Sequence, residues 1–199
     1  EFLPGRFLKN FIINLGMEAE SREALKESGF ALEELEEQEP DPGLGNGGLG
    51  RLASCYLDSM ACLNIAAHGY GIRYDYGIFH QKIVNGWQVE QCDNWLQFGN
   101  PWEITRRHFL YTVKLFGRSE PYHDERGNLR YRWVDTDTVD AMACDIPIPG
   151  YNNETVNNMR LWAAVSSRDF NLDFFNHGDY VRAMEEKVLS ENISKVLYP

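Results

Sequence analysis

Residues 43–51 form a glycine-rich run, Gly-Leu-Gly-Asn-Gly-Gly-Leu-Gly-Arg, with five glycines in nine positions. Glycine tolerates backbone angles closed to other residues and has no Cβ to hold a neighbour away. Apolar residues at helical spacing follow the run, which predicts a helix from Gly47 or Gly48 to about residue 64. Its apolar face is predicted to contain Leu49, Leu52, Ala53, Tyr56, Met60 and Leu63.

A helix that begins in this run would present unpaired backbone N–H groups beside the positive end of its dipole. Such a helix start favours phosphate or another anion. Two other interpretations remain open: a tight loop that needs glycine for packing alone, and a dinucleotide-binding loop, because residues 43–48 match G-x-G-x-x-G. The dinucleotide interpretation is disfavoured, because residues 32–42 indicate an acidic helix broken by two prolines instead of the required strand.

Composition bounds the class of protein. The 199 residues are 43% hydrophobic and 13% aromatic, which fits one folded core in a single domain over residues 1–199. The net charge of −11 argues against nucleic acid and anionic membrane surfaces as partners, because little would neutralise phosphates. No apolar run approaches the length of a membrane span.

The cysteines and histidines give no metal or redox motif. The four cysteines have neither C-x-x-C spacing nor a zinc pattern with histidine, so we expect reduced thiols in a cytoplasmic protein. The five histidines are scattered and none forms H-E-x-x-H, so no metal site is expected. The residues alone reveal one candidate anion-binding loop and no complete catalytic set.

Hydrophobic periodicity indicates an α/β chain. Helices are predicted before the glycine run and near the end of the chain, and strands between them. Asn85-Gly86 predicts a hairpin turn. The predicted helices cover residues 6–16, 18–28, 30–38 and about 178–192; the predicted strands cover 67–74, 77–83, 109–118, 129–144 and 155–166, with 109–118 and 129–144 antiparallel and joined through 124–128.

The run Asp41–Ala53, Asp-Pro-Gly-Leu-Gly-Asn-Gly-Gly-Leu-Gly-Arg-Leu-Ala, resembles the glycine loop and helix of the α-glucan (glycogen, starch or maltodextrin) phosphorylases. The resemblance continues in order through Gly69–Tyr74, Asn100–Glu103 and Met159–Trp162, and ends with Val196–Pro199. It covers the whole chain, and its motifs are long and specific.

The resemblance implies a pyridoxal-phosphate enzyme that uses inorganic phosphate to release glucose 1-phosphate from α-1,4-glucan ends. It implies the glycosyltransferase B arrangement, in which two Rossmann-like domains face a cleft. This chain would be part of the N-terminal domain, with mixed and antiparallel strands and a glycine-capped helix. The cofactor lysine would lie in the C-terminal domain, outside these residues, so the isolated chain is expected to be inactive. A stand-alone phosphate- or sugar-binding module and a dimerisation element are the alternatives.

The resemblance also assigns site residues. The backbone of Gly47, Gly48 and Leu49 would face the phosphates, and Glu1, Asn46 and Leu49 would line the glucose pocket. No catalytic residue is expected within these 199 residues. Residues 178–193 would form a helix that packs across a homodimer interface.

Overall fold

The computed structural model describes residues 1–165, 188 and 192–197. The chain divides into two compact units. The first comprises Glu1–Arg106, Ala143–Ala163 and Ser194–Pro199, and the second comprises Arg107–Met142 and Ala164–Ile193.

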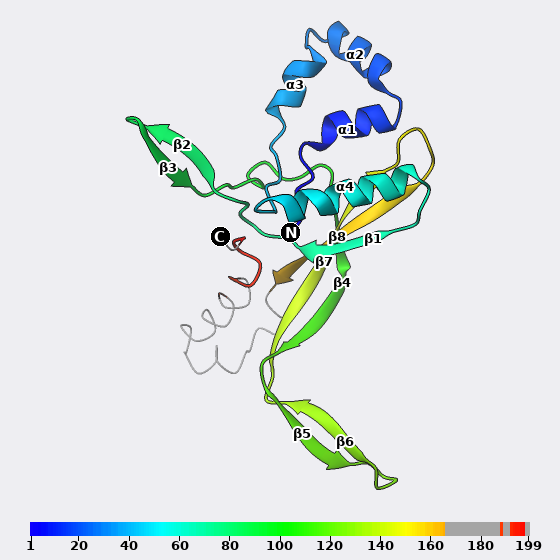
Figure 1. The fold of residues 1–199 in the computed structure, drawn as a ribbon, viewed down its shortest axis with the longest axis vertical. Coiled ribbons are helices and arrows are strands. Elements are labelled where there is room, and N and C mark those ends of the chain that lie inside the picture. Colours follow the sequence, from blue (N-terminus) through cyan, green and yellow to red (C-terminus); the bar gives the residue numbers. More distant parts are fainter. Residues whose placement is uncertain (166–187, 189–191, 198–199) are drawn as a thin grey trace. The chain divides into compact units, whose positions relative to one another are not determined.

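The four helices predicted before residue 65 are confirmed: α1 (Phe7–Asn14), α2 (Glu18–Glu27), α3 (Leu32–Gln38) and α4 (Gly48–Cys62) (Figure 1). Glycine follows the first two helices closely, with φ of +67° at Gly16 and +82° at Gly29. This left-handed conformation ends a helix, and glycine adopts it without a Cβ penalty. The predicted helix over residues 178–192 lies outside the described residues, apart from residues 188 and 192.

A four-stranded sheet has the strand order β1 (His68–Ile72), β8 (Val156–Val165), β7 (Asp137–Pro149) and β4 (Ile104–Leu115). β1 and β8 are parallel, with Gly69 opposite Met159. Together with the helices and the antiparallel hairpins described below, this pairing confirms the mixed α/β class.

The chain forms two antiparallel hairpins, and both turn at the residues that the sequence predicted. β2 (His80–Val84) and β3 (Trp87–Gln91) pair through Asn85 and Gly86, whose φ angles of +52° and +82° fit the predicted tight turn. β5 (Arg118–His123) and β6 (Leu129–Val134) pair across residues 124–128, as predicted.

The prediction of two unbroken long strands over 109–118 and 129–144 was wrong. The first range is divided between β4 and β5, and the second between β6 and β7. Phe116 and Gly117 have φ of +57° and +72°, and Asp135 has φ of +53°. These left-handed residues interrupt the extended backbone on both sides.

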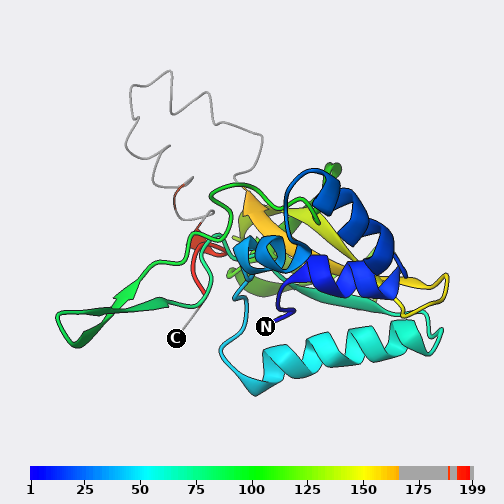
Figure 2. The same ribbon diagram turned by 90° about the horizontal axis from the view of Figure 1, so that it is seen from above.

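α4 lies along β1 in both views of the ribbon (Figures 1 and 2). Its buried residues are Gly50, Ser54, Leu57 and Ala61, none of which belongs to the predicted apolar face, although Met60 of that face is partly buried against the core. Of that predicted face, Leu49, Leu52, Tyr56 and Leu63 are exposed. The reason is close packing between helix and strand. An ideal Cβ at Gly69 of β1 would lie 2.9 Å from Leu57 Cδ1, so the glycine in the strand lets the Leu57 side of the helix approach the sheet.

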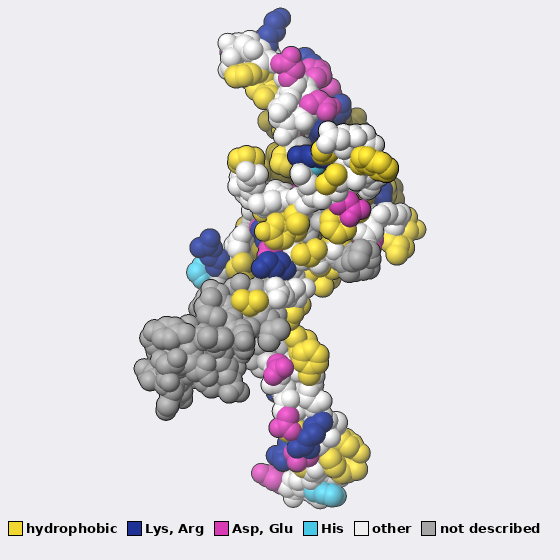
Figure 3. All heavy atoms as spheres, turned by 90° about the vertical axis from the view of Figure 1, so that its left-hand side faces the viewer, with side chains coloured by type: hydrophobic (Ala, Val, Ile, Leu, Met, Phe, Trp, Pro, Cys, Tyr) yellow, Lys and Arg dark blue, Asp and Glu magenta, His cyan; other side chains and the backbone are white. Residues whose placement is uncertain are grey.

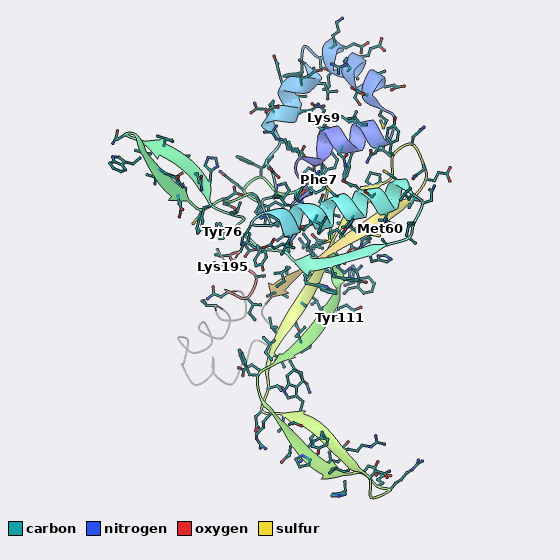
Figure 4. All side chains as sticks on the ribbon, viewed as in Figure 1. Phe7, Lys9, Met60, Tyr76, Tyr111 and Lys195 are labelled. Carbon is teal, nitrogen blue, oxygen red and sulfur yellow. The ribbon has the colours of Figure 1, made fainter. Side chains whose placement is uncertain are left out.

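The main core belongs to the first unit. It joins α1 and α4 to the inner strands, and Phe7 and Met60 mark the contributions of the two helices (Figure 4). Glu39 adds a polar clamp, because its carboxylate accepts hydrogen bonds from the Phe7 and Leu8 backbone N–H groups at 3.1 and 2.9 Å. This carboxylate caps the start of α1, where the dipole favours negative charge.

A buried carboxylate links three strands of the sheet. Asp145 of β7 has a side chain only 6% exposed. Arg106 of β4 donates to it at 3.0 Å, and Arg160 of β8 donates to it at 2.7 and 2.9 Å. The hydrogen bonds from Arg160 hold the pKa of Asp145 far below its usual range, although burial opposes that shift.

We predict that Asp145→Asn in the full-length protein lowers the stability of this region by about 3 kcal/mol, because two arginines lose their buried partner. Thermal unfolding measures this as a lower Tm. The matched control is Asp135→Asn, which breaks an exposed ion pair with Arg118 and should cost less than about 1 kcal/mol.

A comparison of the wild-type protein with Asp145→Asn also gives a prediction of pH dependence. A carboxylate whose folded pKa is depressed stabilises the fold fully above its unfolded pKa of about 4 and loses that contribution as the pH falls towards the folded pKa. The Tm difference between wild type and Asp145→Asn should therefore shrink below about pH 4. A difference that stays constant down to pH 2 would contradict the ion-pair assignment.

Candidate functional site

The glycine run is bracketed by the first residues of the chain. The Phe2 N–H donates to Leu44 O at 2.9 Å, and the Leu3 N–H donates to Gly50 O at 3.0 Å. Within the run, the backbones of Gly45 and Gly50 pack directly against each other. An ideal Cβ at Gly45 would lie 3.2 Å from Gly50 Cα, and one at Gly50 would lie 3.1 Å from Gly45 Cα. Gly45 and Gly50 therefore serve packing.

Gly47 and Gly48 differ from that packed pair. An ideal Cβ at either position would meet no atom within 4 Å. Gly47 has an extended φ of 179°, and Gly48 is not among the residues with positive φ. Neither glycine is therefore required by its backbone conformation or by protein packing.

These two glycines lie at the start of α4, where Gly47 is the N-cap and gives no side-chain cap. The Arg51 N–H donates to Gly47 O at 3.3 Å, and the N–H groups before it have no acceptor within the helix. The start of a 15-residue helix thus combines unpaired donors, a positive dipole end and open space. This arrangement can bind an anion and stabilise developing negative charge, and it supplies no group for proton transfer.

The packing interpretation therefore applies to Gly45 and Gly50, and the anion interpretation applies to Gly47 and Gly48. The dinucleotide interpretation lacks its strand, because residues 39–47 contain only an isolated bridge between Leu44 and Phe2.

The other residues assigned to the pocket lie around the same helix start. Glu1 Cβ would lie 3.4 Å from an ideal Cβ at Gly50, so Glu1 is beside the loop. Asn46 is exposed next to Gly47, and Leu49 is 74% exposed. The structure brings these residues together, and their roles towards a ligand stay predictions.

Arg51 is a site residue that the sequence analysis missed. Its Nη1 donates to Leu3 O at 3.3 Å and to Pro4 O at 2.8 Å, which ties the first residues to α4. Burial raises the pKa of Asp58, about two turns further along α4, and the charge of Arg51 opposes that rise. The sequence carried no signal for this role, because Arg51 contacts backbone almost fifty residues away.

A second missed element supports the run from the other side. The Ile78 N–H donates to Gly43 O at 2.8 Å, and the Gly77 N–H donates to Asp93 O at 3.1 Å. An ideal Cβ at Gly77 would lie 2.8 Å from Gly43 O, so this contact requires glycine. Partial burial raises the pKa of Asp93, and the neighbouring His80 opposes that rise.

The segment that holds Gly77 is anchored in turn near the chain's last described residues. The Tyr76 N–H donates to Lys195 O at 2.9 Å, and both residues are labelled in Figure 4. Backbone hydrogen bonds thus connect the glycine run, at Gly43, to residues 76–78 and from there to Lys195.

The remaining chemistry of the described residues is sparse. Among them, no group of three His, Cys, Asp or Glu side chains could hold a metal ion, and no helix is long and apolar enough to cross a membrane. Cys55, Cys62, Cys92 and Cys144 are all free. Burial raises the pKa of Cys144 to about 12, so this thiol stays protonated.

Comparison with known proteins identifies the family. The family described as Carbohydrate phosphorylase matches residues 25–199. Over all 199 residues the chain is 58% identical to a glycogen phosphorylase from Chlamydia pneumoniae, 57% to the brain form from Rattus norvegicus and 56% to the liver form from Ovis aries.

The matches cover 100% of this chain but only 24%, 23% and 23% of those relatives, so the chain spans about a quarter of their length. The long motifs quoted from the sequence, the mixed α/β fold and the full-length similarity agree. The chain belongs to the carbohydrate phosphorylase family.

Proposed function

We propose that the chain contributes the anion-binding glycine loop of an α-glucan phosphorylase, which uses inorganic phosphate to release glucose 1-phosphate from α-1,4-glucan ends. The observation that carries the proposal is the open backbone at Gly47 and Gly48, at the uncapped start of α4. A phosphate that attacks a sugar needs stabilisation of its negative charge, and preorganised backbone N–H groups give it without reorganisation.

The residues present also fit the phosphate of pyridoxal phosphate. A cradle that a Cβ would fill at Gly47 or Gly48 suits a phosphate group close to the backbone. When bound, pyridoxal phosphate would supply a phosphate group and a titratable pyridine ring. This chain's own part is to orient anions with the backbone of Gly47, Gly48 and Leu49, while Glu1, Asn46 and Leu49 border the sugar. The attachment lysine would belong to a C-terminal domain outside these residues.

The partners proposed for the whole protein are α-1,4-glucan and inorganic phosphate, with no nucleic acid or membrane. A cytoplasmic location is supported by four free thiols, three of them exposed. A homodimer through residues 178–193 is supported by the resemblance alone. Residues 188, 192 and 193 of that range are described, and Val188 and Ile193 are about half exposed.

A stand-alone phosphate- or sugar-binding module is the alternative function. It predicts ligand affinity from these 199 residues alone, whereas an enzyme part predicts activity only with the rest of the protein.

We predict that Gly48→Val in the full-length enzyme lowers kcat for phosphorolysis by about 10²–10³, because the new side chain enters the space where an anion would approach the backbone donors. Stability should be preserved, since that space is open. Steady-state kinetics and Tm on the same preparation measure both effects.

The matched control is Gly50→Ala two residues along. Its Cβ would lie 3.1 Å from Gly45 Cα, so it should lower Tm through packing. Near-normal kcat for Gly48→Val would mean that Gly47 and Gly48 do not face the reacting anion.

We predict that the isolated 199-residue chain is catalytically silent, because the cofactor lysine lies outside it. Maltodextrin and phosphate should yield no glucose 1-phosphate, and added pyridoxal phosphate should give no specific Schiff-base absorbance. Turnover from the purified chain would overturn the assignment as a domain part, and tight phosphate binding without turnover would favour the stand-alone module.

We predict that Met184→Glu, within the proposed interface segment 178–193, shifts the full-length enzyme from dimer towards monomer, because replacing an apolar residue of that segment by a charge would oppose association. Sedimentation velocity measures the shift. Glu185→Gln, which adds no charge next to it, is the control. An unchanged dimer with Met184→Glu would place the interface elsewhere.

A further inference from the structure

The β5–β6 hairpin of the second unit separates charged from uncharged side chains. In the observed register, directly opposed residues share a face, and successive pairs alternate between the two faces. One face carries Arg118, Glu120, Tyr122, Arg130, Arg132 and Val134. The other carries Ser119, Pro121, His123, Leu129, Tyr131 and Trp133, with no carboxylate, lysine or arginine.

Two arginines of the charged face have partners within the hairpin itself. Arg132 donates to Glu120 at 2.8 Å and its guanidinium lies 5.9 Å from the Tyr122 ring centroid. Arg130 donates to Asp124 at 3.1 Å at the turn end. These contacts lie on the charged face and at the turn, and none of them uses a side chain of the uncharged face.

The uncharged face is aromatic and open to solvent. Tyr131 is 65% exposed and Trp133 is 50% exposed, and Leu129 is also exposed beside them. Hydrophobic side chains gather on one side of this hairpin, with charged side chains next to them, at the lower end of Figure 3. Exposed apolar patches of this kind mark binding surfaces.

The tryptophan ring has a fixed orientation. Trp133 Nε1 donates to Phe116 O at 2.6 Å, so one edge of the indole is tied to the backbone. Tyr131 lies two residues before it on the same strand face, about 7 Å away along the strand. Two aromatic rings two residues apart on one strand face give two stacking positions in one direction.

We propose that this uncharged face of β5–β6 binds an α-glucan chain, at a site separate from the glycine loop. The apolar C–H face of a pyranose ring stacks on Tyr and Trp rings, while their polar edges and the side chains of Ser119 and His123 offer hydrogen bonds to sugar hydroxyls. The absence of carboxylates, lysine and arginine on this face suits an uncharged polymer. The contrast is with the chain as a whole, which has a net charge of −11. The choice of ligand rests on the proposed function.

The exposed side of α4 is another apolar surface of the described residues, and its composition is different. Three of its four exposed large side chains, Leu49, Leu52 and Leu63, are aliphatic, and the fourth is Tyr56. The hairpin face instead combines aromatic rings, proline and uncharged polar groups, which is the chemistry of a sugar platform.

The test uses the full-length enzyme and soluble amylose, with binding measured by affinity electrophoresis in the absence of phosphate. Tyr131→Ala and Trp133→Ala should each weaken amylose binding about tenfold. Tyr122→Ala removes an aromatic ring from the opposite face of the same hairpin and should leave binding unchanged. The kcat/KM for a short maltooligosaccharide should stay at the wild-type value in all three variants.

A second measurement needs no variant. Hydroxyl-radical footprinting of the wild-type enzyme should label Tyr131 and Trp133 in the free protein and show at least a severalfold protection of both by amylose. Labelling that amylose does not change would overturn the proposal. So would absence of labelling in the free enzyme, because the face would then be covered by protein.

The two proposals fail in different ways. A wild-type enzyme that binds amylose through Tyr131 and Trp133 but forms no glucose 1-phosphate would refute the proposed function and not the hairpin site. An active enzyme whose amylose affinity is the same in Trp133→Ala, Tyr131→Ala and Tyr122→Ala would refute the hairpin site alone.

Discussion

The close approach of Gly45 and Gly50 determines where α4 begins. No side chain fits between these backbones, whose ideal Cβ-to-Cα distances are 3.1–3.2 Å, and the bonds of Phe2 and Leu3 close the loop from the outside. This contact turns the chain sharply and leaves the intervening residues exposed. The open donors at Gly47 and Gly48 are therefore a consequence of packing on either side of them.

Glycines also position the rest of α4. Leu57 packs over Gly69 of β1, and an ideal Cβ at Gly150, after β7, would lie 2.4 Å from Ala61 O near the end of the helix. Close contacts at glycine positions near the start, the middle and the end of α4 therefore fix its place. A site formed by backbone N–H groups needs such rigidity, because the donors move only with the helix.

Local patterns in the sequence predicted the elements well and their packing less well. Asn85-Gly86 defines its own hairpin turn, and the glycine run defines the start of α4, because both depend on near neighbours. The packed face of α4 depends on Gly69 and Met159, which are remote in sequence. The break at Asp135 gave no signal, since this is a non-glycine residue in the left-handed region. Gly117, next to Phe116, did mark the other break, but the prediction of one strand over 109–118 passed over it. Likewise, the support from Arg51, Gly77 and Asp93 uses contacts between distant segments.

The wrong face of α4 has a physical explanation of its own. Apolar residues occur on its packed side at Leu57 and Ala61, and also on its exposed side at Leu49, Leu52 and Leu63. A helix that is apolar on both sides is typical of one buried between layers, and its periodicity does not select a single face. That composition fits a chain that spans about a quarter of its relatives' length. Small residues at the contacts then decide the packed side, because Gly50 lies against the Gly45 backbone and the Ala61 backbone lies against Gly150.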